Sequence, residues 1–540
     1  MAHRLHWQIV LALAGTLLIC GLVGSVALTN AARSLPLTGS VYVEGVVGVA
    51  SQLNPLLATP GAPQSERDLQ ALLFDGLTQS GPDGTPTPAL AERWLISSDS
   101  TVYTFTLRSG LRWHDAVPLT SDDVVWTIQS IQRPDFPGDK ALADLWRSVV
   151  VTPLDSRRVQ FALRVPFAPF LAATAVPILP AHLLQTIPPA RWTADPFSHA
   201  PIGSGPFRLE RLDSSQAVLR PFEGAVRGRP SIDLLILRFF PNTASAQAAL
   251  QRHDVQGVAM TATIGEQPAV RGPTLRTTTA ALDEYTILTF NVGEGLLHAI
   301  EVRRALTQSL DRDAIISQML GGVAQRLDTP ILPNSWAASD ARLPAYDPPA
   351  AIQQLRSAGW QRQADGAWRQ DKDQLELPLV VANTPPQIAL ANEVARQWRQ
   401  IGIGISVEAV APAVLAQHLA QHNFTIALND WSEVSDDPDP YALWHSSQID
   451  NGANYAGLAD DKLDQLLVAG RTTTDQTKRK QIYADVQRRW TELVPSLPLF
   501  QPHLVFIHDV LIVPSGVEGT LLDGSADRFR MISDWSVTSQ

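Results

Sequence analysis

The chain has 540 residues, a formal net charge of −11, 45% hydrophobic residues and 18% charged residues. A chain of this length exceeds what one hydrophobic core can hold, so we expect two or three domains. The acidic balance and the lack of any Arg/Lys cluster argue against nucleic acid or an anionic membrane surface as a main partner. The single cysteine, Cys20, lies near the N-terminus, so the rest of the chain has no disulfide, thiolate nucleophile or cysteine metal site.

The N-terminal segment is strongly apolar. Residues 9–28 carry no charge and follow Arg4, and the run is long enough to cross a bilayer as a helix. Three interpretations are open: a cleaved secretory signal, a retained anchor, or lipidation at Cys20, which the bulky Ile19 disfavours. Each places the rest of the chain outside the cytoplasm, at the cell surface or in the periplasm. We therefore assign residues 1–35 to a signal peptide or membrane anchor and expect residues 9–28 to provide the tether.

The first half of the chain predicts strands and helices in irregular alternation. We expect a strand at 41–49, a helix at 65–77, a strand pair at 100–113, a helix at 119–132 capped by Thr120 or Ser121, two strands within 149–165, and a turn into a strand at 201–212.

From about residue 285 the pattern becomes regular. We expect a buried strand at 285–292, helical structure at 298–320, a helix at 346–360, a strand at 375–383, a helix and a strand within 388–410, a strand at 423–428, a helix at 477–493 and strands within 495–513. Strands that alternate with helices indicate a sheet with helices on both faces.

The stretch 423–441 stands out among these elements. Its apolar run, Phe424 to Leu428, leads into a loop with a tryptophan and four aspartates: Asp430, Trp431, Asp436, Asp437 and Asp439. A strand that ends in an irregular loop carrying a Trp and carboxylates often lines a ligand pocket. The alternative is an acidic surface loop terminated by proline.

Other clusters do not indicate a catalytic or metal site. His418 and His422 have i,i+4 spacing but lack the glutamate and third ligand of a zinc motif, so we expect a solvated helix face. Gly203-Ser204-Gly205 precedes Pro206, which favours a hinge or tight turn over a nucleophile elbow. No phosphate-binding glycine loop or calcium loop is present. We expect no cofactor and no metal, and a binding protein in preference to an enzyme.

Ordered motifs indicate a family. TFTLRSGLRWHDAVPLTSDDVVWTI (104–128) resembles the pattern LRxGxxxHDGxPLTAxDV, with Ala116 in place of a usual glycine. Further blocks in the same order lie at 201–207, 289–316, 344–360, 395–408 and 454–467. Over about residues 41–513 the chain resembles family 5 of the extracytoplasmic solute-binding proteins of ABC transporters, the group that binds peptides, dipeptides and nickel.

The resemblance implies an α/β, two-lobe fold of the periplasmic-binding-protein type (type II, large cluster). Lobe I would comprise 36–288 plus 500–540, with an inserted subdomain at about 80–200, and lobe II would comprise 289–499. It also implies closure of a hinge around a small-molecule or oligopeptide ligand and its delivery to ABC permease subunits in the membrane. We expect a monomer.

The resemblance also implies ligand-binding positions. In peptide-binding members an Asp three residues after the pocket Trp holds the ligand's α-ammonium; with the Trp at Trp431, that position is Val434. Either Glu433 or Asp436 substitutes for it, or the usual amine clamp is absent. From lobe I, Glu66 is expected to face the cleft and Trp146 to supply an aromatic lid, with a packing role as the alternative for each. The expected ligand-binding set is Trp431, Ser432, Glu433, Val434, Asp436, Glu66 and Trp146.

Two other functions compete with solute import. One is a membrane-anchored solute receptor or scaffold on the same fold, without a transport role. The other is a secreted hydrolase, although the sequence shows no catalytic nucleophile together with a general base.

Overall fold

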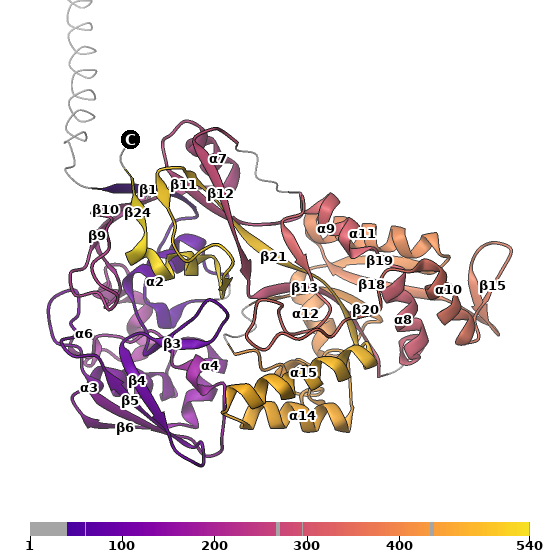
Figure 1. Cartoon of the computed structure of the whole chain (residues 1–540), viewed down its shortest axis with the longest axis horizontal. Helices are drawn as coiled ribbons and strands as arrows, with labels where there is room; N and C mark the ends of the chain where they lie inside the picture. Colours follow the sequence, from indigo (N-terminus) through magenta and orange to yellow (C-terminus); the bar gives the residue numbers. More distant parts are fainter. Residues whose placement is uncertain (1–39, 60, 266–270, 294, 433–436, 539–540) are drawn as a thin grey trace, which may run out of the picture.

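The computed structural model describes residues 40–59, 61–265, 271–293, 295–432 and 437–538. One large mixed sheet runs through both halves of the protein (Figure 1). Its thirteen strands are β1 (Val41–Val47), β8 (Phe207–Leu212), β9 (Gln216–Pro221), β10 (Leu234–Phe240), β11 (Gly257–Thr261), β12 (Leu275–Leu282), β13 (Glu284–Phe290), β14 (Ala324–Arg326), β18 (Glu376–Ala382), β19 (Gly404–Val410), β20 (Ile426–Ser432), β21 (Ser496–Asp509) and β23 (Leu521–Leu522).

The sheet order is β19-β18-β20-β13-β21-β11-β1-β10-β9-β8, with β12 and β14 also paired to β21 and β23 paired to β12. Strands β18, β19 and β20 pair in parallel, as do β1 and β10, which agrees with the alternating β/α pattern of these segments. The remaining strands form small separate sheets: β2 (Thr78–Ser80) with β3 (Pro86–Pro88); β4 (Ala91–Ile96), β5 (Val102–Leu107), β7 (Arg158–Ala162) and β6 (Val150–Asp155); β15 (Gln361–Arg362), β16 (Trp368–Gln370) and β17 (Asp373–Gln374); β22 (Ile512–Val513) with β24 (Ser536–Val537).

The helices pack around these sheets. They are α2 (Gln64–Leu73), α3 (Ser121–Gln132), α4 (Lys140–Arg147), α5 (Phe170–Ala173), α6 (Ala181–Leu184), α7 (Thr243–Gln251), α8 (Ile300–Gln308), α9 (Arg312–Met319), α10 (Pro348–Ser357), α11 (Pro385–Gln400), α12 (Pro412–Ala420), α13 (Tyr441–Trp444), α14 (Asp461–Thr472) and α15 (Gln476–Leu493). Short 3₁₀ helices are η1 (Pro55–Leu57), η2 (Pro189–Ala194), η3 (Pro196–Ser198), η4 (Gly295–His298), η5 (Ser446–Gln448) and η6 (Ser525–Asp534). In the described part of the chain, no helix is both long enough and apolar enough to span a bilayer.

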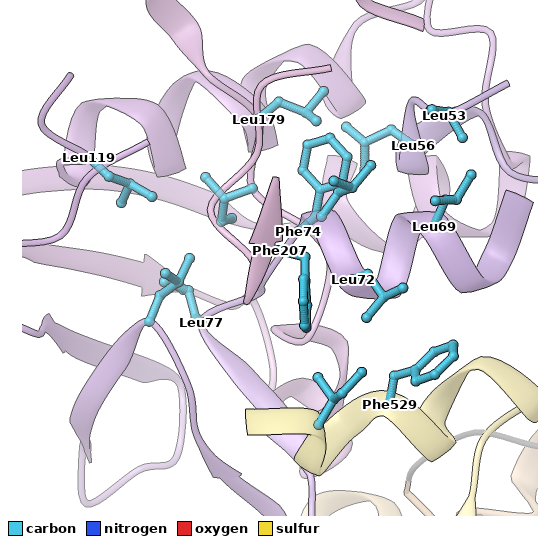
Figure 2. Close-up of a cluster of buried hydrophobic side chains, with 14 of the residues drawn as sticks. Leu53, Leu56, Leu69, Leu72, Phe74, Leu77, Leu119, Leu179, Phe207 and Phe529 are labelled. Atoms are coloured by element: carbon cyan, nitrogen blue, oxygen red, sulfur yellow. The ribbon is translucent and has the colours of Figure 1, made fainter. Parts of the chain in front are cut away.

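Two large hydrophobic cores divide the molecule. The first is built from residues between Tyr42 and Leu282 and from the C-terminal segment after Leu504. Figure 2 shows part of it, in which Leu69 and Leu72 of α2 belong to the same cluster as Phe207 and Phe529. The second core is built almost entirely from residues between Ala281 and Phe500. The two cores confirm the predicted α/β fold with two lobes.

Strand β21 belongs to both cores. Its first residues pair with β13, as in Thr286 with Phe500, and its later residues, from His503 on, pair with β11 and β12. The chain also passes from one core to the other between β12 and β13, at Asp283. The side-chain amide of Gln501 donates a hydrogen bond to the carbonyl oxygen of Leu282 at 2.8 Å. These two crossing segments are therefore joined to each other where they pass between the cores.

A buried ion cluster attaches the C-terminal segment to the first core. Arg528 of η6 contacts Glu44 of β1 at 2.7 Å and Asp68 of α2 at 2.5 Å, and all three side chains are fully buried. Because a buried guanidinium needs compensating charge, the two carboxylates fix η6 against β1 and α2. This contact explains why the last described residues complete the N-terminal core.

Most sequence predictions of elements are confirmed, and two are wrong. The helix at 121–132 begins after Thr120, whose hydroxyl and Asp123 form the capping box. The strand pair expected at 100–113 is the single strand β5, because the chain turns at Gly110 with φ +75° and continues as a loop. The helix expected at 298–320 is two helices: α8 ends at Gln308, and Asp311 caps the start of α9 by accepting a hydrogen bond from the N–H of Ala314.

Candidate functional site

A cavity of about 180 Å³ lies where the two segments cross between the cores. On one side it is lined by the end of β11 and the residues that follow, Thr261 to Ile264, and on the other by β13, β20 and the start of α11 of the second core. Its lining residues are Thr261, Ala262, Thr263, Ile264, Glu284, Tyr285, Thr286, Leu320, Pro386, Gln387, Leu390, Asp430, Trp431, Phe500 and Pro502. Since β11 belongs to the first half of the chain and both crossing strands contribute, a molecule bound here would contact both halves of the protein.

Asp430 is the best-defined charged group in this cavity. The hydroxyl of Thr286, directly across the β13–β20 ladder, donates to one carboxylate oxygen at 2.7 Å. The side-chain amide of Gln387, in the first turn of α11, donates to the other at 2.5 Å. The carboxylate remains open to solvent within the cavity, yet the surrounding protein raises the pKa of Asp430 above its ordinary value. The sequence analysis singled out Asp430, but not Thr286, Gln387 or Glu284.

Trp431 lies beside Asp430 at the end of β20. Its ring stacks on Tyr455 with centroids 5.4 Å apart and an angle of 12° between the planes. Trp431 is half-buried and lines the cavity, so part of its surface stays available. That it contacts ligand stays a prediction.

Other predicted ligand residues follow Trp431 directly. The backbone of Ser432 ends β20 opposite Glu284. Glu433, Val434 and Asp436 lie outside the described residues. The predictions for these three positions therefore stay as they were made from the sequence.

The far end of the acidic loop is structural. The carboxylate of Asp437 accepts two hydrogen bonds of 2.7 Å from the Arg479 guanidinium, and both side chains are buried. Although burial alone would lower the pKa of Arg479, the hydrogen bonds and charge of Asp437 raise it. Asp439 pairs with Arg471 at 2.7 Å, and burial raises the pKa of Asp439. These two aspartates anchor the loop to α14 and α15, so the expectation of an acidic surface loop is wrong for them.

Arg471 also joins the two cores. Its guanidinium lies 3.8 Å from the ring centroid of Tyr441, which packs on the second core, and 5.5 Å from that of Phe167, which packs on the first. The backbone N–H of Ala168 donates to the carbonyl oxygen of Arg471 at 2.8 Å. A cation between two aromatic faces attracts both of them. The loop that begins near the crossing strands at Trp431 thus ends at a contact between the halves.

Three hydrogen bonds extend this contact. The backbone N–H of Trp336 donates to the carbonyl of Asp83, Gln476 donates to Thr85, and the hydroxyls of Ser100 and Thr474 are 2.8 Å apart. Each bond joins the first half of the chain to the second. The two halves are therefore in contact on the side bounded by β2, β3 and α15 as well as at the crossing strands.

The two predictions for the first lobe are not supported. Glu66 is 5% exposed, and one of its carboxylate oxygens accepts hydrogen bonds from the N–H and hydroxyl of Ser51 and from the N–H of Gln52. It holds the 51–52 turn against α2. Trp146 is completely buried, with its ring 5.8 Å from Phe161 and 5.6 Å from Phe170. The packing alternative describes Trp146, which is a core residue and no lid.

Two further sequence motifs have structural explanations. The expected solvated helix face is wrong for His422, because α12 ends at Ala420 and both ring nitrogens of His422 lie 3.0 Å from carbonyl oxygens, those of Tyr455 and Ile449. Among the described residues, no group of three potential metal ligands is found. A Cβ at Gly203 would lie 1.8 Å from the carbonyl oxygen of Leu73, so this glycine permits close packing against the end of α2.

Comparison with known proteins places this arrangement in context. A family model described as bacterial extracellular solute-binding proteins, family 5 (middle) matches residues 85–452. The chain is 27% identical over 513 residues to the oligopeptide-binding protein AppA of Bacillus subtilis (strain 168), covering 93% of this chain and 92% of that protein. It is 25% identical over 459 residues to the dipeptide-binding protein of Escherichia coli (strain K12), with coverage of 79% and 84%. The solved structure of AppA from Bacillus subtilis in complex with a nonapeptide matches with a TM-score of 0.69 and 25% identity, covering 94% of this chain and 100% of that one.

Proposed function

Because the chain belongs to the bacterial extracellular solute-binding proteins, family 5, we propose that it captures a peptide-like or other small solute between its lobes and delivers it to the permease of an ABC importer. The names of its relatives, which are oligopeptide- and dipeptide-binding proteins, support the peptide-like class. Capture in this proposal is non-covalent and needs no catalytic residue.

The observation that carries this proposal is the cavity at the crossing strands, which is lined by the end of β11 on one side and by the second core on the other. We propose lobe I as 36–288 plus 500–540, with an inserted subdomain at about 80–200, and lobe II as 289–499. Closure would bend the chain at two places only, near Asp283 and within β21, since these are the segments that pass between the cores.

Solute binding would favour the closed arrangement. A solute held by both lobes binds the closed form more tightly than the open form, so its affinity includes the free energy of closure. The contact of Arg471 with Phe167 and the hydrogen bond from the Ala168 N–H to the Arg471 carbonyl exist only when the lobes are together, and they support a closed form with its own stabilising interactions. In this proposal the protein acts as a monomer outside the cytoplasm, tethered to the outer face of the membrane by residues 9–28.

Native mass spectrometry of the full-length protein, purified without added ligand, tests capture directly. The proposal predicts a 1:1 complex with a small solute that is lost on denaturation, and a rise in melting temperature when that solute is added back. A panel of peptides, sugars and metal complexes that leaves the mass and the melting temperature unchanged would contradict the proposal.

A further inference from the structure

The polar lining of the cavity at the crossing strands is dominated by hydrogen-bond acceptors. Two carboxylates, those of Asp430 and Glu284, belong to the lining, and none of the described lining residues is Lys, Arg or His. The hydroxyl of Thr286 is already committed to Asp430. A carboxylate has about four acceptor sites. Since Asp430 uses one on each oxygen, about two stay open toward the cavity.

Gln387 adds a further acceptor. Its side-chain nitrogen faces the Asp430 carboxylate, to which it donates a hydrogen bond. That orientation leaves Oε1 of Gln387 buried and without a hydrogen-bond partner among the described residues. The hydroxyl of Tyr285 is likewise buried and without a described partner. Buried polar atoms are rarely left unpaired, so this pattern points to a missing donor.

Besides Thr261 and Thr263, the remaining lining of the cavity is apolar. Leu390, Phe500 and Pro502 contribute hydrocarbon and aromatic surface. A volume of about 180 Å³ accommodates a charged head group with a short alkyl stem. The cavity therefore combines negative charge, open acceptors and an apolar wall.

We propose that this cavity binds a positively charged nitrogen group rich in N–H donors, an alkylammonium or a guanidinium, held by the Asp430 carboxylate and the Gln387 Oε1. Two sources share this chemistry: a free small organic cation, or the charged end of the transported solute. The second source rests on the proposed solute capture, while the first does not.

Calorimetric titration of the full-length protein with butylammonium chloride tests the site, with butan-1-ol as the uncharged probe of equal length. The proposal predicts binding of butylammonium and none of butanol. Asp430→Asn, which keeps the shape and removes the charge, should weaken butylammonium binding roughly 10- to 100-fold, the usual loss for a charge-assisted hydrogen bond. Asp485→Asn removes a carboxylate from the exposed face of α15 and should leave binding unchanged. The thermal midpoints of both variants report whether they are folded.

A second arm separates the two sources. Trialanine with a free amino end and N-acetyl-trialanine are titrated into the same proteins. If only the free-amine peptide binds and Asp430→Asn abolishes the preference, the site takes the charged end of the solute. If butylammonium binds and neither peptide does, it takes a free cation.

Two results would overturn the cation site. One is equal binding of both peptides by the wild type and by Asp430→Asn, without butylammonium binding; solute capture would then stand and the cation site would not. The other is the absence of binding by all three charged or peptide probes to folded wild-type protein, in which case capture is judged separately by the native mass spectrum.

Discussion

The ion pair between Asp437 and Arg479 gives the sharpest prediction for stability. Their side chains are 4% and 6% exposed, and two hydrogen bonds of 2.7 Å join them. Asp437→Asn keeps the side-chain volume but leaves the guanidinium buried without its counter-charge. Arg479 keeps only neutral partners, the Gly470 carbonyl and the Tyr483 hydroxyl. Breaking one side of such a pair costs about 3–5 kcal/mol, so the free energy of unfolding should fall by about that much.

Urea unfolding followed by tryptophan fluorescence measures this loss. The matched control is Asp485→Asn, which breaks an ion pair with Arg488 whose side chains are 49% and 64% exposed, and it should cost less than about 1 kcal/mol. The double variant Asp437→Leu/Arg479→Met removes both charges and should recover most of the stability. Equal losses in Asp437→Asn and Asp485→Asn would refute the reasoning that burial sets the cost.

Three further predictions follow from the site and its surroundings. Trp431→Ala should weaken solute binding by more than it lowers the melting temperature, because the ring lines the cavity and loses only a partly exposed stack on Tyr455; equal losses in calorimetry and thermal unfolding would identify a core residue. Arg471→Ala should reduce solute affinity through loss of the contact between the lobes, with the closed fraction in small-angle scattering falling in parallel; an unchanged closed fraction would contradict that role. Burial raises the pKa of Asp75 to about 6 despite the attraction of Arg227, so its ionisation opposes folding as pH rises from about 4 through 6. Asp75→Asn should therefore raise the unfolding free energy at pH 7.5 by on the order of 1–2 kcal/mol and lose that advantage at pH 4, as urea titrations at the two pH values would show.

Local signals explain why most elements could be predicted from the sequence. Thr120 capped its helix as expected, and the apolar run before Asn429 formed β20, because caps and strand patterns depend on neighbouring residues. The break at Asp311 also had a local signal, an aspartate that can cap a new helix, but the continuous helical periodicity outweighed it. Fold and family were thus accessible from pattern and motif.

The candidate site was harder to predict because its contacts join distant residues. The partners of Asp437 and Asp439 lie 42 and 32 residues further along the chain, so no local pattern distinguishes these buried, paired aspartates from surface charges. Gln387 lies on α11, 43 residues before Asp430, so their hydrogen bond is also beyond the reach of any local sequence pattern. Glu66 is an example of the opposite error. The resemblance predicted that its carboxylate faces the cleft, whereas in the structure it holds the turn at Ser51.

Closure of two lobes around a solute is the central claim, and a distance measured between the lobes tests it most directly. Leu95 of β4 and Val468 of α14 are exposed and lie in different halves, so cysteines at these positions, in a Cys20→Ser background, can carry fluorescent labels. Single-molecule energy transfer on the labelled protein should show two distances without solute. Added solute should shift the population to the shorter distance and saturate at one solute per chain. Saturating binding with no change in the two populations would contradict capture by closure.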